Sequence, residues 1–195
     1  MGDEDSIRET LIDANRILST TPGVKAALAG AGARNVYAEP RNTGDLDYAV
    51  VLDDDEHYQN LLQRLRAAGF ELRTEQGDPP ERYPSLVVLE RAGIRLDLLI
   101  AKTEFEHQAV ARANDVVSKD AVLRVVRLED LLVYKLIASR SKDWNDIEAL
   151  VHEQNRRKTP IDWRHVREQL RPFGRRAQLD RAMDYDRSLD RDLER

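Results

Sequence analysis

The apolar positions of the first twenty residues recur at helical spacing, which predicts an amphipathic helix. They are Ile7, Leu11, Ala14, Ile17 and Leu18. A Thr-Pro-Gly break at residues 21–23 ends this helix. The Ala-rich segment from about Val24 then predicts a second helix, which the glycines at 30 and 32 interrupt.

The apolar, β-branched and aromatic residues over 46–52 predict a strand. Its two faces carry Leu46, Tyr48, Val50 and Leu52 on one side and Asp45, Asp47, Ala49 and Val51 on the other. The carboxylates of Asp45 and Asp47 therefore leave the same face.

Further elements follow in chain order. They are a helix capped at 53–55 that ends at Gly69, a short strand at 70–73, and a hairpin of 86–90 and 94–100 about Gly93. Next come a helix from the Thr103/Glu106 capping box to about Asn114, a strand at 121–126, and helices at 128–139, 143–152 and beyond Pro160. This order predicts an α/β (α+β) fold, a mixed β-sheet flanked by helices. We expect residues 1–126 to form the core and residues 127–195 a C-terminal helical region that completes an active-site cleft.

Composition narrows the function classes. The 195 residues include no Cys, which excludes disulfides, thiolate metal sites and a cysteine nucleophile. We see no apolar run that could span a bilayer and no signal segment, so we expect a cytoplasmic protein without membrane contact. The net charge of -5 argues against general polyanion binding, so nucleic acid would need a local basic patch.

The paired carboxylates Asp45 and Asp47 are the first candidate for chemistry. Like charges on one strand face repel unless a cation or solvent compensates them. Hard oxygen ligands suit Mg²⁺ or Mn²⁺, which often bridge carboxylates to substrate phosphates. The alternative is a solvated strand end with turn-forming Asp.

Asp97 strengthens this candidate. Its strand has a buried face formed by Ile94, Leu96, Leu98 and Ile100. A carboxylate in the middle of an apolar strand needs a partner, and Arg95 on the same face is a structural alternative. If this strand lies beside the strand at 46–52, three carboxylates converge on one metal centre.

Lys135 lies on the apolar stripe of the 128–139 helix. It could reach a phosphate group in a cleft, or its ammonium could snorkel to solvent. The polar cluster that follows it consists of Arg140, Lys142, Asp143 and Asp146. The structural alternative for this cluster is a helix-capping turn with Asp143 as the N-cap.

The stretch from Gly30-Ala31 through Pro40-Arg41-Asn42-Thr43-Gly44-Asp45-Leu46-Asp47 resembles the nucleotidyltransferase superfamily, in which a glycine motif precedes a strand with paired aspartates. The Arg-x-Thr-x-Asp-x-Asp form, followed by Leu128-Glu129-Asp130-Leu131, Lys135 and the 140–146 cluster, is similar to AbiE-type abortive-infection toxins and their uncharacterised relatives. Together these motifs cover about residues 28–150.

The resemblance implies a polymerase-beta-like fold and metal-dependent transfer of a nucleoside monophosphate from an NTP to a hydroxyl acceptor. The metal ligands for Mg²⁺ or Mn²⁺ would be Asp45, Asp47 and Asp97. Lys135 would contact phosphate, and Asp143 would act as general base or positioning group. The implied nucleotide contacts are Gly30, Ala31, Arg41, Thr43 and Lys135.

Three functions fit this pattern. The first is an active nucleotidyltransferase, such as a toxin with a cognate antitoxin partner and RNA or tRNA as acceptor. The second is a degenerate binding or regulatory protein, which Ala31 favours because relatives carry Gly or Ser there. The third is an antibiotic-type, small-molecule nucleotidyltransferase. The Arg-rich residues 156–158 and 171–176 could contact RNA or form a solvated helix face.

Overall fold

The computed structural model of the chain describes residues 3–77 and 83–193. The chain divides into two compact units, which we describe separately. Unit 1 comprises Met1–Gly32 and Asn42–Val126, and unit 2 comprises Ala33–Arg41 and Arg127–Arg195. Across the described residues, no helix combines the length and hydropathy that a membrane span requires.

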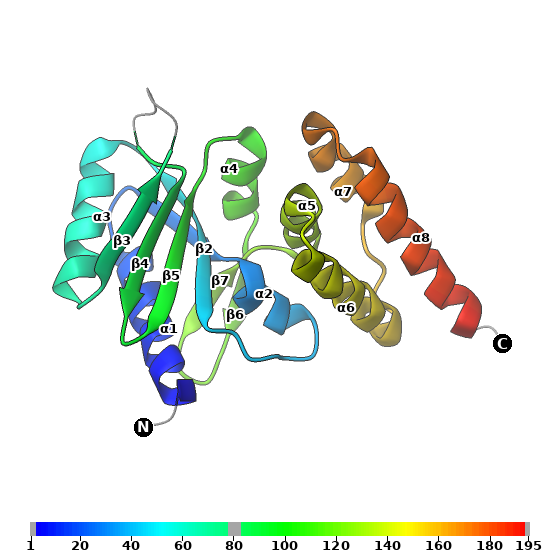
Figure 1. Cartoon of the computed structure of the whole chain (residues 1–195), viewed down its shortest axis with the longest axis horizontal. Helices are drawn as coiled ribbons and strands as arrows, with labels where there is room; N and C mark the ends of the chain where they lie inside the picture. The colour runs from blue at the N-terminus through cyan, green and yellow to red at the C-terminus, as the bar shows by residue number, and fades with distance from the viewer. Residues whose placement is uncertain (1–2, 78–82, 194–195) are drawn as a thin grey trace. The chain divides into compact units, whose positions relative to one another are not determined.

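Unit 1 is built on a mixed sheet, as predicted (Figure 1). Its strands are β1 (Val24–Leu28), β2 (Asp45–Leu52), β3 (Glu71–Gln76), β4 (Leu86–Arg91), β5 (Ile94–Ile100), β6 (Asn114–Val117) and β7 (Val122–Val125). They run in the spatial order β3-β4-β5-β2-β1-β7-β6. The pairs β2–β5 and β1–β7 are parallel, and the other neighbours are antiparallel.

The helix predicted from Val24 is wrong, because this segment is strand β1. Ala27 and Leu28 are buried between β2 and β7. Helix propensity is a weak prior, and alanine also fits a crowded sheet interior where neighbouring strands supply the bulk. Strand β6 was not predicted, since its two valines follow two polar residues at the sheet edge.

Three helices flank this sheet: α1 (Asp3–Thr20), α3 (Asp55–Ala67) and α4 (Glu104–Ala111). Their predicted boundary signals are present. Asp54 caps α3, and Thr103 and Glu106 make both bonds of a capping box at α4. The β4–β5 hairpin turns at Ala92 and Gly93, both with positive φ, the geometry of a two-residue turn.

Unit 2 is helical. Helix α2 (Gly30–Tyr37) begins in the last residues of the first segment of unit 1 and continues into unit 2. The others are α5 (Leu128–Ala138), α6 (Ser141–Arg157), α7 (Trp163–Leu170), the 3-10 helix η1 (Arg171–Phe173) and α8 (Arg176–Leu193). Their core includes the fully buried Leu131, Leu132, Leu136, Ile147, Leu150 and Val166. Trp163 and Asn155 both donate hydrogen bonds to Asp186, which ties α8 to α6 and α7.

Candidate functional site

Three carboxylates and one guanidinium share one face of β2 and β5 in unit 1. The parallel register places Asp45 beside Arg95 and Asp47 beside Asp97. We call these four residues the carboxylate face. Asp45 is exposed, whereas Asp47 and Asp97 are partly buried. The two strands that carry these acids are therefore neighbours, as a convergence of the three carboxylates requires.

Within the carboxylate face, Arg95 binds Asp97 in a bidentate pair. Its Nε donates to Asp97 Oδ1 at 2.6 Å and its Nη2 to Oδ2 at 2.8 Å. The hydrogen bonds that Arg95 donates to Asp97 raise the pKa of Arg95, and the charges of Asp45 and Asp47 add to this effect. The structural alternative for Asp97, a partner in Arg95, is thus realised.

The donor set of the carboxylate face fits a divalent metal in its chemistry, since carboxylate oxygens are the ligands that Mg²⁺ and Mn²⁺ prefer. Yet no three Asp, Glu or His side chains among the described residues are gathered as ligands of one ion. Asp97 is instead held by Arg95. A metal role for these acids stays a proposal.

Gly30 lies directly against Asp47. Its φ is +50°, and a Cβ atom built there would lie 1.8 Å from Asp47 Oδ2. The backbone N–H of Ala29 donates to the Asp47 carbonyl at 2.8 Å. A glycine is needed here because the backbone at the start of α2 packs on the carboxylate. The phosphate contact that the resemblance implies for Gly30 stays a prediction. Ala31 follows in the first turn of α2 and is partly buried.

Thr43 braces the start of β2. Its Oγ1 accepts the N–H of Asp45 at 3.3 Å and donates to the Asp45 carbonyl at 3.1 Å. The hydroxyl therefore holds backbone, which orients the strand end that carries Asp45.

In unit 2, Asp146 is surrounded by cations. Lys135 Nζ donates to Asp146 Oδ2 at 2.7 Å, and both side chains are only 6% exposed. Arg41 donates from Nε and Nη2, each at 3.1 Å, and Arg34 Nε lies 3.6 Å from Oδ1. We call these four residues the Asp146 cluster. The Lys135 ammonium does not snorkel to solvent, because Asp146 compensates it in the interior.

Burial would raise the pKa of Asp146, but hydrogen bonds from Arg41 and Lys135 hold it below its ordinary value. Asp146 belonged to the predicted 140–146 cluster but not to the predicted site residues. The signal that could have selected it is an acid directly before Ile147, on a helix whose Ile147, Leu150 and Val151 are fully buried. Such an acid requires a cationic partner.

Asp143 closes the start of α6. It accepts the backbone N–H of Arg140 at 3.1 Å and the Arg140 Nε at 2.7 Å, and it lies 3.9 Å from Lys135 Nζ. The residue occupies the third helical position, whereas the structural alternative made it the N-cap. Its carboxylate thus accepts the N–H of the N-cap residue, which is the acidic half of a capping box.

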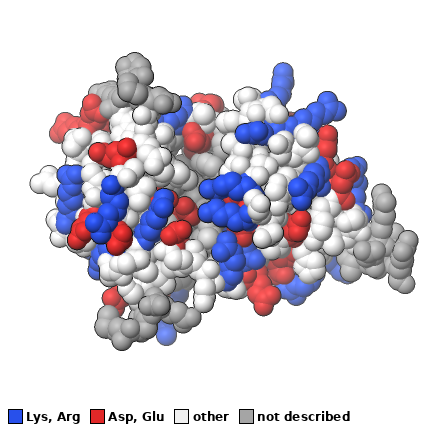
Figure 2. All heavy atoms as spheres, viewed as in Figure 1, with Lys and Arg blue, Asp and Glu red and all other residues white. Residues whose placement is uncertain are grey.

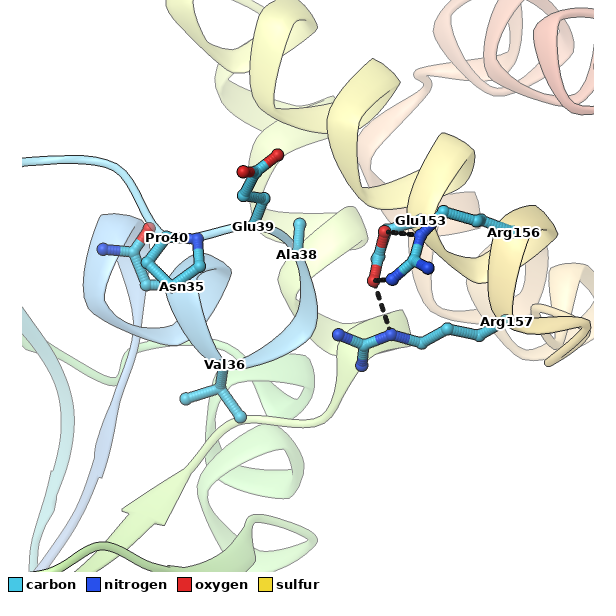
Figure 3. Close-up of a pocket in the computed structure, with 8 residues that line it drawn as sticks. All are labelled: Asn35, Val36, Ala38, Glu39, Pro40, Glu153, Arg156 and Arg157. Atoms are coloured by element: carbon cyan, nitrogen blue, oxygen red, sulfur yellow. Dashed lines mark hydrogen bonds and ion pairs between the residues drawn. The ribbon is translucent and has the colours of Figure 1, made fainter.

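An open depression of about 500 Å³ in unit 2 contains none of the predicted catalytic residues. Figure 3 shows Glu153 of α6 in this depression, with the guanidinium groups of Arg156 and Arg157 directed at it. Their hydrogen bonds lower the pKa of Glu153 to about 2. Acidic and basic side chains also interleave over the visible surface in Figure 2. The exposed Arg156 and Arg157, paired with Glu153, fit a solvated face for residues 156–158.

Glu153→Gln should destabilise the protein in a pH-dependent way. The pKa of Glu153 falls from 4.5 to about 2 on folding. Its pairing with Arg156 and Arg157 therefore stabilises the folded protein to the full extent at pH values above the unfolded pKa. This contribution is lost as pH falls through the folded pKa. Urea midpoints of wild type and variant should differ at about pH 6 and converge toward about pH 2. A gap that stays constant over this range contradicts the assignment, and Glu168→Gln, in an exposed pair with Arg164, is the control.

Solved structures with a similar fold are nucleotidyltransferases. The antibiotic-resistance factor ANT(2")-Ia in complex with adenylyl-2"-tobramycin aligns with a TM-score of 0.55 at 15% identity, covering 88% of this chain and 99% of that one. A protein from Thermotoga maritima described as a nucleotidyltransferase gives 0.52 at 13% identity, with coverage of 76% and 94%. Another from H. pylori gives 0.50 at 19% identity, with coverage of 95% and 84%. At these identities the likeness establishes the fold alone.

A search of curated proteins gives no match. The family described as "Nucleotidyl transferase of unknown function (DUF2204)" matches residues 50–180, more than half of the 195-residue chain. The match contains Asp97, Lys135 and Asp143, and it begins shortly after Asp47. With this family match and a mixed sheet shared with nucleotidyltransferase structures, the chain belongs to this nucleotidyl transferase family.

Proposed function

We propose that the chain is an active enzyme that transfers a nucleoside monophosphate from an NTP to a hydroxyl acceptor. The observation that carries this proposal is the register of β2 and β5, which sets Asp47 beside Asp97 with Asp45 on the same face. Like charges directly opposite on neighbouring strands destabilise a sheet. A cation that takes part in chemistry would compensate these charges.

In this proposal Asp45, Asp47 and Asp97 hold Mg²⁺ or Mn²⁺, which would stabilise charge on the triphosphate and the leaving pyrophosphate. The protein contributes orientation. The loop at Gly30 sets the position of the Asp47 carboxylate, and Thr43 sets the end of β2 beside Asp45.

The residues of unit 2 keep proposed roles of their own. Lys135 contacts phosphate if its ammonium exchanges Asp146 for a phosphate oxygen, and Arg41, 44% exposed, can do the same from the surface. Asp143 is held by Arg140. We therefore assign Asp143 to positioning the Lys135 ammonium and not to the role of general base. The AbiE-type toxin role, an antitoxin partner and a cytoplasmic location remain predictions from the sequence.

The acceptor is either a small molecule or RNA. ANT(2")-Ia, which shares the fold, was captured with adenylyl-2"-tobramycin, an adenylylated aminoglycoside. This observation supports an aminoglycoside-like hydroxyl compound as one acceptor class. Degenerate function is the second candidate, because Arg95 holds the third carboxylate.

Asp45→Asn/Asp47→Asn should abolish nucleotidyl transfer while the chain stays folded. The protein is incubated with each α-labelled NTP and Mg²⁺, with either tRNA or an aminoglycoside as acceptor. We expect label on one acceptor and a loss of about 100-fold or more in the variant, the order of effect of removing transition-state charge stabilisation. Asp115→Asn, an exposed acid on strand β6 of the same sheet, is the matched control.

Undiminished transfer in the double variant would contradict the assignment of these acids. If the wild type neither transfers label nor shows an NTP-dependent thermal shift, the degenerate function replaces the proposed one.

A further inference from the structure

The pair between Arg95 and Asp97 places a positive charge among the proposed metal ligands. Arg95 is 47% exposed at its side chain, whereas Asp97 is 13% exposed. The arginine therefore has room to move toward solvent, and the aspartate is fixed in the sheet.

The charges of the carboxylate face add to −2, from three carboxylates and one guanidinium. The register sets Arg95 beside Asp45, and its hydrogen bonds go to Asp97, diagonal to Asp45. The raised pKa of Arg95 reflects all three acids, with Asp97 first among them. One guanidinium thus serves as the shared counter-ion of the three acids, and one divalent cation would balance the remaining charge.

A second arginine of the same sheet shows what is particular about Arg95. Arg73 on β3 is also 47% exposed and also binds a carboxylate through two atoms, Glu90 at 3.2 Å for each bond. Neither Arg73 nor Glu90 lies among the proposed metal ligands. Arg73 also pairs with a second acid, Glu71, at 3.0 Å. Exposure, bidentate geometry and further acidic neighbours are therefore common to both arginines, and Arg95 differs in that its acids are the proposed metal ligands.

We propose that Arg95 is the counter-ion of Asp97 and that it competes with the divalent metal ion for this carboxylate. Without the ion it offsets one of the three negative charges of the carboxylate face and stabilises the sheet. The ion binds all three acids only when the guanidinium releases Asp97. This inference rests on the proposed function, because it takes the three acids as metal ligands.

The test measures Mn²⁺ affinity from the electron paramagnetic resonance signal of the free ion. Wild type is compared with Arg95→Gln, with Asp97→Asn and with the matched control Arg73→Gln. We expect Arg95→Gln to bind Mn²⁺ about tenfold more tightly, because a repelling charge next to the ion is removed. Asp97→Asn should bind more weakly, and Arg73→Gln should equal wild type. Without Mn²⁺, Arg95→Gln should unfold at a lower temperature than wild type. Added Mn²⁺ should raise the unfolding midpoint of Arg95→Gln by more than it raises that of wild type.

Two results would overturn the inference. The first leaves the proposed function intact, and the second also removes its metal step. If wild type binds Mn²⁺ and Arg95→Gln binds equally or more weakly, Arg95 is no competitor, and the proposed function stands. If neither protein binds Mn²⁺ while circular dichroism shows both folded, the metal step of the proposed function fails with it.

Discussion

Asp146→Asn should unfold at a much lower urea concentration than wild type. The substitution removes the hydrogen-bonded anion of the buried Lys135 ammonium, which then has only the more distant Asp143 at 3.9 Å, and it removes the bidentate acceptor of Arg41. Breaking a buried ion pair by removing one partner costs about 3–5 kcal/mol in the free energy of unfolding, because the remaining charge stays desolvated. Arg34, whose Nε has no hydrogen bond, would lose its nearest anion as well.

Two further variants separate this cause from a general loss of packing. Asp180→Asn, in an exposed pair with Arg176, should change the free energy of unfolding by less than about 0.5 kcal/mol. Lys135→Met/Asp146→Leu should recover part of the loss, since an apolar pair of similar volume can replace a buried ion pair. A single Asp146→Asn variant as stable as Asp180→Asn would refute the cluster's structural role.

Gly30→Ala should displace the Asp47 carboxylate and lower the rate of nucleotidyl transfer. The new methyl would lie 1.8 Å from Asp47 Oδ2 at a residue with φ of +50°, so the carboxylate or the loop must move. A displacement of about 1 Å at a catalytic group can lower turnover by about 100-fold. We expect that loss in nucleotidyl transfer, and a fall of more than about 1 kcal/mol in the free energy of unfolding, since alanine is strained at positive φ.

The matched control is Gly44→Ala, next to Asp45. A Cβ there meets no atom within 4 Å. This variant should keep the stability and transfer rate of wild type. Gly30→Ala activity within about twofold of wild type would show that the loop does not set the position of Asp47.

Local signals in the sequence predicted most of the fold. The capping box of Thr103 and Glu106, the Asp cap of α3 and the turn at Gly93 depend on neighbouring residues only, and all three are present. The prediction of a helix from Val24 was wrong because the conformation of this segment depends on its neighbours β2 and β7, which other parts of the chain supply. Its alanines carry a helical preference that sheet packing overrides.

The candidate site divides in the same way. Alternation along the strands predicted that Asp45 and Asp47 share a face, and the β2–β5 register then brought Asp97 beside Asp47. The sequence left the partner of Asp97 open between a metal and Arg95. The central place of Asp146 follows from the packing of α5 against α6, which sets Lys135 and Asp146 side by side although they are eleven positions apart in the sequence. No pattern within one helix reports that contact.

The reaction class is tested most directly by the fate of the labelled phosphates. Wild-type protein with Mg²⁺ and acceptor is given the preferred NTP labelled at either the α- or the γ-phosphate. A nucleotidyltransferase attaches the α-label to the acceptor and releases the γ-label as pyrophosphate in equal amount. Transfer of the γ-label to the acceptor, or release of orthophosphate without α-label on any acceptor, would contradict the proposed reaction.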